Sequence, residues 1–123
     1  MRAEIIAIGD ELTSGQRLDT NSQWLSQQLA DLGIRALLHT TVGDDLEAGT
    51  YVFRQAVQRA DVILSTGGLG PTADDLTRDC LAQVCGVDLV CSEAVLGVCP
   101  RLLSTRNRRL GILCSEKAVR GRC

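Results

Sequence analysis

A glycine-rich segment, Thr66–Thr72, offers the clearest chemistry in this sequence. It reads TGGLGPT and follows DVILS, a short apolar run typical of a buried strand. Gly67, Gly68 and Gly70 carry no Cβ, so backbone N–H groups can closely approach a bound anion. A helix predicted to begin near Asp74 would direct the positive end of its dipole at the same place. The segment predicts an anion-binding turn, but a plain strand-to-helix turn capped by Asp74 explains the glycines equally well.

Neither of the best-known phosphate-binding motifs is present in this segment. The pattern is not GxGxxG, and no GK[ST] follows the glycines. The dinucleotide fingerprint and the P-loop of nucleoside triphosphatases are therefore excluded.

Three acidic pairs each follow a predicted strand: Asp10–Glu11, Asp44–Asp45 and Asp74–Asp75. The carboxyl ends of parallel strands meet at one edge of a sheet, so we expect these carboxylates to ring one cleft. Hard divalent cations prefer oxygen ligands, and phosphate substrates usually arrive with such a cation. The alternative interpretation is that the acids are helix caps and solvated loop charges.

The loop Gly9–Ser22 adds further polar groups at the same predicted edge. Its carboxylates, hydroxyls and the Asn21 amide suit a polar ligand, yet each is also a routine turn or cap residue. His39 lies within a strand pattern and is interpreted as structural. The sequence predicts no Ser-His-Asp or Cys-His arrangement.

Alternating elements must position these loops. In chain order the patterns predict a strand at Glu4–Ile8, a helix at Trp24–Leu32, a strand at Ile34–Thr41, a helix from Leu46 to Ala60, a strand at Asp61–Ser65 and a helix at Leu76–Val84. Strand and helix in alternation predict an α/β fold with a parallel sheet covered on both faces. Ligands of such sheets bind at the loops that follow the strands.

Length and composition narrow the function classes. A chain of 123 residues fits one domain. Aromatic residues make up only 2%, so stacking platforms for single-stranded nucleic acid are not expected. A net charge of −2 gives no general attraction to nucleic acid or acidic membranes. Neither a signal peptide nor an apolar run of the roughly 20 residues that cross a bilayer is found. We expect a cytoplasmic protein without nucleic-acid or membrane partners.

The last third of the chain differs in composition. All six cysteines lie beyond position 79 without a CxxC pair, so reduced thiols are expected rather than a zinc site or disulfides. Residues 1–90 carry a net charge of −7 and residues 91–123 a net charge of +5. Val87–Val90 is predicted as a short strand, and Ser92–Leu103 as a helix broken or kinked at Pro100.

Three segments carry a resemblance to a known family. They are AEIIAIGDELTSGQRLDTNSQWLSQQLADLG near the start, VGDD at Val42–Asp45, and STGGLGPTADDLT at Ser65–Thr77. Together they resemble the opening of CinA-like (competence/damage-inducible A) proteins. They are also similar to the molybdenum-cofactor-biosynthesis domain of the molybdopterin-binding proteins Mog, MoaB and MoeA. The resemblance covers roughly residues 1–90.

The resemblance implies a three-layer α/β/α sandwich with a mostly parallel sheet, and a homo-oligomer, since the Mog and MoaB branch is commonly trimeric. It implies that the glycine loop holds the phosphate of a pterin, such as molybdopterin, or of a nucleotide. Asp44 and Asp75 match the two essential aspartates of the Mog branch and are the implied catalytic and metal-binding residues, with Mg or Co as the metal. The remaining ligand-binding candidates are Gly9, Asp10, Glu11, Asn21, Thr66, Gly67, Gly68, Gly70, Pro71, Thr72 and Asp74.

Two activities are associated with CinA-like proteins. One is metal-dependent cleavage of ADP-ribose-type pyrophosphates by this domain, and the other is a nicotinamide-nucleotide amidase in a separate domain that nothing in this chain matches. Three hypotheses follow: a pyrophosphate hydrolase, a binding module without turnover, and an inactive gene fragment.

The resemblance fails towards the C-terminus. Residues 1–96 are interpreted as a partial domain, and residues 97–123 as an atypical tail rich in arginine and cysteine. A truncated or frameshifted gene product explains this change, and it predicts a sheet that is incomplete at the C-terminus.

Overall fold

The computed structural model describes residues 1–70, 72–90 and 121–122. Pro71 and the predicted helix Ser92–Leu103 therefore lie outside the described residues. The elements, in chain order, are β1 (Arg2–Ile8), α1 (Asp10–Thr13), α2 (Thr20–Asp31), β2 (Arg35–Val42), α3 (Leu46–Arg59), β3 (Val62–Thr66), α4 (Thr77–Cys85), β4 (Leu89–Val90) and β5 (Gly121–Arg122).

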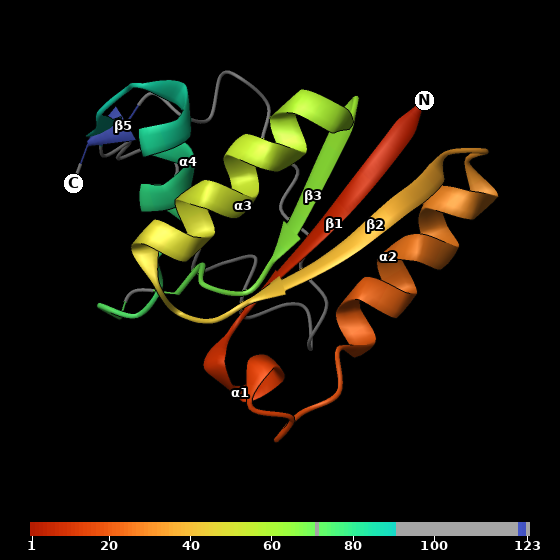
Figure 1. Cartoon of the computed structure of the whole chain (residues 1–123), viewed down its shortest axis with the longest axis horizontal. Helices are drawn as coiled ribbons and strands as arrows, with labels where there is room; N and C mark the ends of the chain where they lie inside the picture. The colour runs from red at the N-terminus through yellow and green to blue at the C-terminus, as the bar shows by residue number, and fades with distance from the viewer. Residues whose placement is uncertain (71, 91–120, 123) are drawn as a thin grey trace, which may run out of the picture.

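A parallel sheet in the order β2–β1–β3 forms the centre of the molecule (Figure 1). β1 is paired on both sides, and every residue from Ala3 to Ile8 is buried. Burial on both faces explains why this strand reads as a near-continuous apolar run. β4 and β5 form a separate parallel pair.

Helices cover both faces of this sheet (Figure 1). On one face Ala3 and Ile5 of β1 pack with Leu29 of α2. On the other face Ile6 of β1 packs with Phe53 of α3, and α4 packs on α3. Alternate residues of β1 thus supply the two halves of the core, as a strand with period two requires. The three layers confirm the predicted α/β/α fold.

Two small residues let α3 and α4 approach each other closely. A Cβ on Gly49 of α3 would lie 2.6 Å from the Cys80 sulfur of α4. The Cys80 thiol donates to the Leu46 carbonyl at 3.7 Å, and its burial raises its pKa. Among the described residues, Cys80 and the exposed Cys85 are both free cysteines.

A buried carboxylate joins the sheet to α3. Glu4 of β1 is fully buried and accepts hydrogen bonds from the Arg59 Nε at 2.8 Å and Nη2 at 2.7 Å. The Thr40 hydroxyl of β2 donates to the same carboxylate at 2.8 Å. Hydrogen bonds from Arg59 lower the pKa of Glu4, with help from Thr40 and against the effect of burial. The apolar pattern of β1 therefore contains one ionised group that tertiary contacts satisfy.

The structure corrects two local predictions. The short helix α1 lies inside the segment interpreted as a loop, Gly9–Ser22. The fourth helix begins at Thr77 with Leu76 as its N-cap, so the prediction of a helix start near Asp74 with Asp74 as cap is wrong. The Asp75 carboxylate instead binds the N–H and hydroxyl of Thr72, which closes a turn before the helix.

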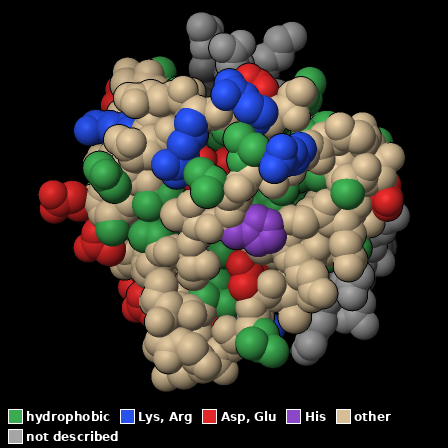
Figure 2. All heavy atoms as spheres, turned by 45° about the vertical axis from the view of Figure 1, so that its right-hand side comes forward, with side chains coloured by type: hydrophobic (Ala, Val, Ile, Leu, Met, Phe, Trp, Pro, Cys, Tyr) green, Lys and Arg blue, Asp and Glu red, His purple; other side chains and the backbone are tan. Residues whose placement is uncertain are grey.

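β2 forms one edge of the three-stranded sheet, and part of it is exposed. Leu37 and Leu38 are each 41% exposed, and His39 contacts the Ser26 hydroxyl of α2 through Nε2 at 2.6 Å. Figure 2 shows the single histidine at the surface, with hydrophobic and basic side chains around it. His39 thus lies in a strand as expected, in a Ser–His contact that its sequence context did not reveal. In the part of the chain that the structure describes, no helix is long and apolar enough to cross a membrane.

Candidate functional site

The candidate site lies where the chain leaves the carboxyl ends of β1 and β3. These strands are neighbours, and the connections from them lead to opposite faces of the sheet: to α2 after β1 and to α4 after β3. Such a point is where parallel sheets bind ligands, because the two following loops diverge there. α1 and the loop after it lie beyond these strand ends (Figure 1).

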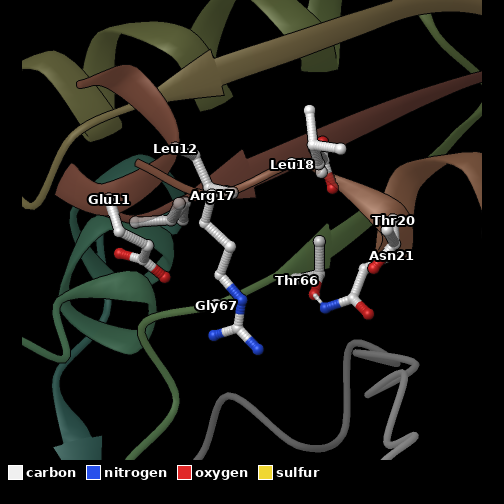
Figure 3. A pocket seen from close by; sticks show the side chains of 10 residues that line it. Glu11, Leu12, Arg17, Leu18, Thr20, Asn21, Thr66 and Gly67 are labelled. Atoms are coloured by element: carbon white, nitrogen blue, oxygen red, sulfur yellow. Dashed lines mark hydrogen bonds between the residues drawn. The ribbon is translucent and has the colours of Figure 1, made fainter. Parts of the chain in front are cut away.

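A cavity of about 100 Å³ opens at this point. It is smaller than the roughly 300–1,000 Å³ of a drug-sized site, so it holds a phosphate-sized or sugar-sized part of a ligand. Its walls come from the end of β1, the following loop, the first turn of α2 and the end of β3 (Figure 3). The lining residues are Ile8, Glu11, Leu12, Arg17, Leu18, Asp19, Thr20, Asn21, Thr66 and Gly67.

One hydrogen bond crosses the cavity from α2 to β3. The Asn21 Nδ2 donates to the Thr66 Oγ1 at 3.0 Å (Figure 3). Because the Thr66 oxygen accepts this bond, its own hydroxyl hydrogen remains available for a ligand acceptor. Asn21 and Thr66, both candidates from the sequence, are therefore brought together as a polar wall of the cavity.

The glycine turn is anchored to α4 through its carbonyl groups. The buried Thr77 hydroxyl donates to the Gly67 carbonyl at 2.7 Å, and the Thr77 N–H donates to the Gly68 carbonyl at 3.2 Å. A trans peptide directs its C=O and N–H to opposite sides. The N–H groups of Gly68 and Leu69 therefore point away from α4, and neither donates to another described residue.

Glycine is required at Gly67 and Gly68 for two reasons. Both have positive φ, 91° and 60°, a conformation that costs other residues free energy. A Cβ at Gly67 would collide with the Ile8 carbonyl, and one at Gly68 would collide with the Thr77 hydroxyl. The sequence predicted that the missing Cβ atoms let an anion approach the backbone, whereas in the structure β1 and α4 are the neighbours that a Cβ would meet.

The distal part of the turn is held by side chains. Arg78 donates to the Gly70 carbonyl at 2.7 Å, and Asp75 accepts from the Thr72 N–H at 2.9 Å and from its hydroxyl at 2.6 Å. The Thr72 hydroxyl, the N–H groups of Thr72 and Gly70, and the nearby Arg78 charge lower the pKa of Asp75. Asp75 is thus ionised and committed to the turn through Oδ2.

Asp10 and Asp44 form a second polar link, between the loops after β1 and β2. The Asp44 N–H donates to the Asp10 Oδ1 at 2.8 Å, and the Asp10 N–H donates to the Asp44 Oδ2 at 3.1 Å. A Cβ at Gly43 would lie 2.6 Å from the Asp10 Oδ1, so this link also depends on a small residue. Asp10 and Asp44 are adjacent as predicted, but neither lines the cavity.

The three acidic pairs do not ring one cleft. Asp45 caps α3 by accepting from the Ala48 N–H at 2.7 Å, and Asp74 is exposed. Of the six acids only Glu11 lines the cavity, and its carboxylate packs against Gly9, where a Cβ would lie 2.6 Å from Oε2. Among residues 1–70 and 72–90, no three His, Cys, Asp or Glu side chains come close enough to hold a metal ion. The cap interpretation therefore explains Asp45 and the turn explains Asp75.

Arg17 is the cavity residue that the sequence analysis missed. It is the only basic residue between Gly9 and Ser22, and that isolated positive charge among acids was the available signal. The loop positions it because the Arg17 N–H donates to the Glu11 carbonyl at 2.9 Å, which folds the chain back over α1.

Comparisons with known proteins found a family model, relatives and solved structures that are similar to this chain. A family model described as "Probable molybdopterin binding domain" matches residues 4–102. A CinA-like protein of Frankia casuarinae is 51% identical over 89 residues, which cover 72% of this chain and 21% of that protein. A CinA-like protein of Cytophaga hutchinsonii is 41% identical over 117 residues, covering 95% of this chain and 28% of that protein. The chain thus spans about a fifth to a quarter of these relatives' length.

Solved structures share the fold. The protein CinA from Thermoplasma acidophilum, of unknown function, superposes with a TM-score of 0.77 and 31% identity over 86% of this chain and 63% of that one. The molybdopterin biosynthesis enzyme MoaB from Thermus thermophilus gives a TM-score of 0.65 and 26% identity over 85% of this chain and 65% of that one.

Proposed function

The chain belongs to the probable molybdopterin binding domain family, and from this premise we propose that it binds a phosphate-bearing pterin or nucleotide in the cavity at the carboxyl ends of β1 and β3. One observation carries the proposal: the carbonyls of the glycine turn are held by Thr77, so that its N–H groups are left for an anion. A further group supports it, the available hydroxyl hydrogen of Thr66.

A divalent metal, which the family resemblance suggests, fits the described residues poorly. Asp44 and Asp75 each use one carboxylate oxygen in a backbone hydrogen bond, and no three-ligand group is formed in the described segments. Mg²⁺ is commonly held by one or two carboxylates together with substrate phosphates and water. The described donor set therefore does not build a metal site by itself, and we derive no reaction step through a metal.

Calorimetric titration of the 123-residue chain with AMP and with ADP-ribose tests the proposal, using Gly68→Ala as the site variant. The new Cβ would collide with Thr77 and displace the turn. Loss of a charge-assisted hydrogen bond costs about 1.5–3 kcal/mol, so affinity should fall about tenfold or more. Gly86→Ala is the matched control, because Gly86 has φ 63° and nothing within 4 Å of an added Cβ.

Three outcomes decide the proposal. Binding that is lost in Gly68→Ala and kept in Gly86→Ala supports it. Equal loss in both variants assigns the effect to backbone strain and contradicts it. Absence of binding by the unaltered chain also contradicts it.

Pyrophosphate hydrolysis is the finer candidate, and the same samples test it. Chromatography of ADP-ribose incubated with the chain and Mg²⁺ or Co²⁺ would detect AMP as a product. Turnover that is lost in Asp75→Ala would assign catalysis to the turn. If the chain binds ADP-ribose but forms no AMP, binding is supported and hydrolysis is contradicted.

A further inference from the structure

We propose that Arg17 makes the cavity selective for a ligand that ends in a phosphate monoester, in preference to one whose phosphate is a diester. This inference rests on the proposed function and deepens it. It separates pterin or nucleoside monophosphates from ADP-ribose-type pyrophosphates, in which each phosphate is linked on two sides, by an ester bond to a ribose and by an anhydride bond to the other phosphate.

The position of Arg17 is the first part of the argument. Its side chain extends into the space between Glu11 and the Asn21–Thr66 pair (Figure 3). Gly67, the first residue of the glycine turn, lines the same cavity. A phosphate bound beside Gly67 would therefore lie within a small cavity that also contains a guanidinium group.

The second part is that the Arg17 guanidinium has no partner among the residues that the structure describes. In the described part of the chain, Arg2 pairs with Asp61, Arg59 with Glu4, and Arg78 with the Gly70 carbonyl. Arg17 makes no ion pair and no side-chain hydrogen bond to a described residue, and it is the arginine that lines the cavity. Five N–H donors are thus available for a ligand in the fork geometry that matches phosphate.

The acids of the cavity do not neutralise this charge. The Asp19 Oδ1 accepts from the Ser22 N–H at 3.0 Å as the N-cap of α2, and the Glu11 carboxylate packs against Gly9. Neither carboxylate lies within ion-pair distance of Arg17. Because Asp19 caps the N-terminus of α2, the Arg17 guanidinium is the positively charged side chain that the described cavity lining offers to an anion.

Charge and size together favour a terminal phosphate. A phosphate monoester carries a charge of about −1.5 to −2 at pH 7 with a second pKa near 6, whereas a diester carries a single charge. A terminal phosphate also offers three oxygens to the guanidinium and the glycine amides at once. A cavity of about 100 Å³ admits the end of a ligand more readily than a bridging phosphate substituted on both sides.

AMP and its methyl phosphodiester form the matched pair of probes, because they differ only in esterification of the phosphate. Calorimetry at pH 7.5 should show that the unaltered chain binds AMP about tenfold more tightly than the methyl ester. In Arg17→Gln the preference should fall to about twofold or less. Arg54→Gln, which changes an exposed arginine of α3 outside the cavity lining, should keep the full preference.

The pH dependence gives a second readout, which a merely structural role of Arg17 would not move. Arginine stays charged, so AMP affinity of the unaltered chain should rise between pH 5 and pH 7 as the monoester loses its second proton. This rise should be much smaller in Arg17→Gln and absent for the methyl ester.

An unchanged preference in Arg17→Gln, or equal affinity of the unaltered chain for both probes, overturns the inference while leaving the proposed function standing. If the unaltered chain binds none of AMP, the methyl ester, ADP-ribose and inorganic phosphate, both the inference and the proposed function are overturned. Arg17 is exposed and holds no described side-chain contact, so its variant should fold.

Discussion

Asp10 and Asp44 each accept a hydrogen bond from the other's backbone N–H, at 2.8 Å to Asp10 and 3.1 Å to Asp44. The exchange links the loops after β1 and β2 across 34 positions of the sequence. It therefore gives two acids of the predicted cleft a structural role, in addition to any contact with a ligand.

Replacement of Asp44 tests this structural role through the free energy of unfolding. Asp44→Ala should lower the free energy of unfolding by about 1 kcal/mol, the net value of a typical hydrogen bond. Asp44→Asn keeps an acceptor oxygen and should lose less than about half as much. Urea denaturation followed by circular dichroism measures both values.

Asp74→Ala is the control for Asp44, because Asp74 is exposed and has no hydrogen bond to another described residue. Its free energy of unfolding should match that of the unaltered chain. If Asp44→Asn destabilises as much as Asp44→Ala, the backbone link is not what Asp44 provides.

The Glu4–Arg59 pair should behave as a buried charge that needs its partner. Arg59→Met leaves a carboxylate with 0% side-chain exposure and only the Thr40 bond, which should cost about 2–3 kcal/mol. This is below the value for a fully buried pair because the Arg59 side chain is 43% exposed. Chemical denaturation at pH 7 measures the loss.

The pH dependence of this loss of stability follows from the direction in which Arg59 shifts the pKa of Glu4. Arg59 lowers the pKa of Glu4 below 4.5, so the pair's contribution is full above the unfolded pKa and is lost as pH falls through the folded pKa. The difference between the unaltered chain and Arg59→Met should therefore shrink below about pH 4. Glu4→Met combined with Arg59→Met should recover most of the stability, and failure to recover it would contradict the assignment.

The turn closed by Asp75 should open at low pH. Thr72 lowers the pKa of Asp75, so the turn is fully held above the ordinary value near 3.9 and released as pH falls through the lowered value. Nuclear magnetic resonance titration of the Gly70 and Thr72 amides should report that pKa. In Thr72→Val the titration should move towards the ordinary value, and an unchanged midpoint would refute the role of the hydroxyl.

Removal of two buried hydroxyls, those of Thr77 and Ser22, should affect the stability of the fold differently. Thr77→Val strips the Gly67 carbonyl of its donor and should destabilise by about 1–3 kcal/mol. The Ser22 hydroxyl is buried without a hydrogen-bond partner among the described residues, so Ser22→Ala should be neutral or stabilising by up to about 1 kcal/mol. Thermal unfolding of both variants measures the contrast, and a marked loss in Ser22→Ala would reveal a partner for that hydroxyl.

The fold was predictable because its signals are local. Apolar runs, helical spacing and glycine stops identified the strands β1 to β3 and the helices α2 to α4 in the right order, but not the short helix α1. Asp45, one of the acids that could serve as a helix cap, caps α3. The start of α4 was not predictable, because the sequence offered Asp74 as a helix cap, whereas Asp75 closes a turn with Thr72 and Leu76 is the N-cap. Only the tertiary bonds of Thr77 and Arg78 to the glycine turn decide between them.

The sequence predicted where the site lies, but not which charged residues line it. Strand ends and glycines located Thr66, Gly67 and Asn21 at one cavity. Local sequence does not report whether a charged side chain has a partner. Asp10 and Asp44 are engaged with each other, whereas Arg17 remains available, and both facts depend on contacts between distant segments.

Because Gly49 lies so close to Cys80, the rate at which this thiol reacts with a labelling reagent reports how often α4 separates from α3. A labelling reagent reaches Cys80, which is 2% exposed, only when α4 separates from α3, while Cys85 at the end of the same helix is exposed throughout. α4 also carries Thr77, so a motion of the whole helix that exposes Cys80 would also move the anchor of the glycine turn. A ligand that binds in the cavity and holds this turn should therefore slow the labelling of Cys80.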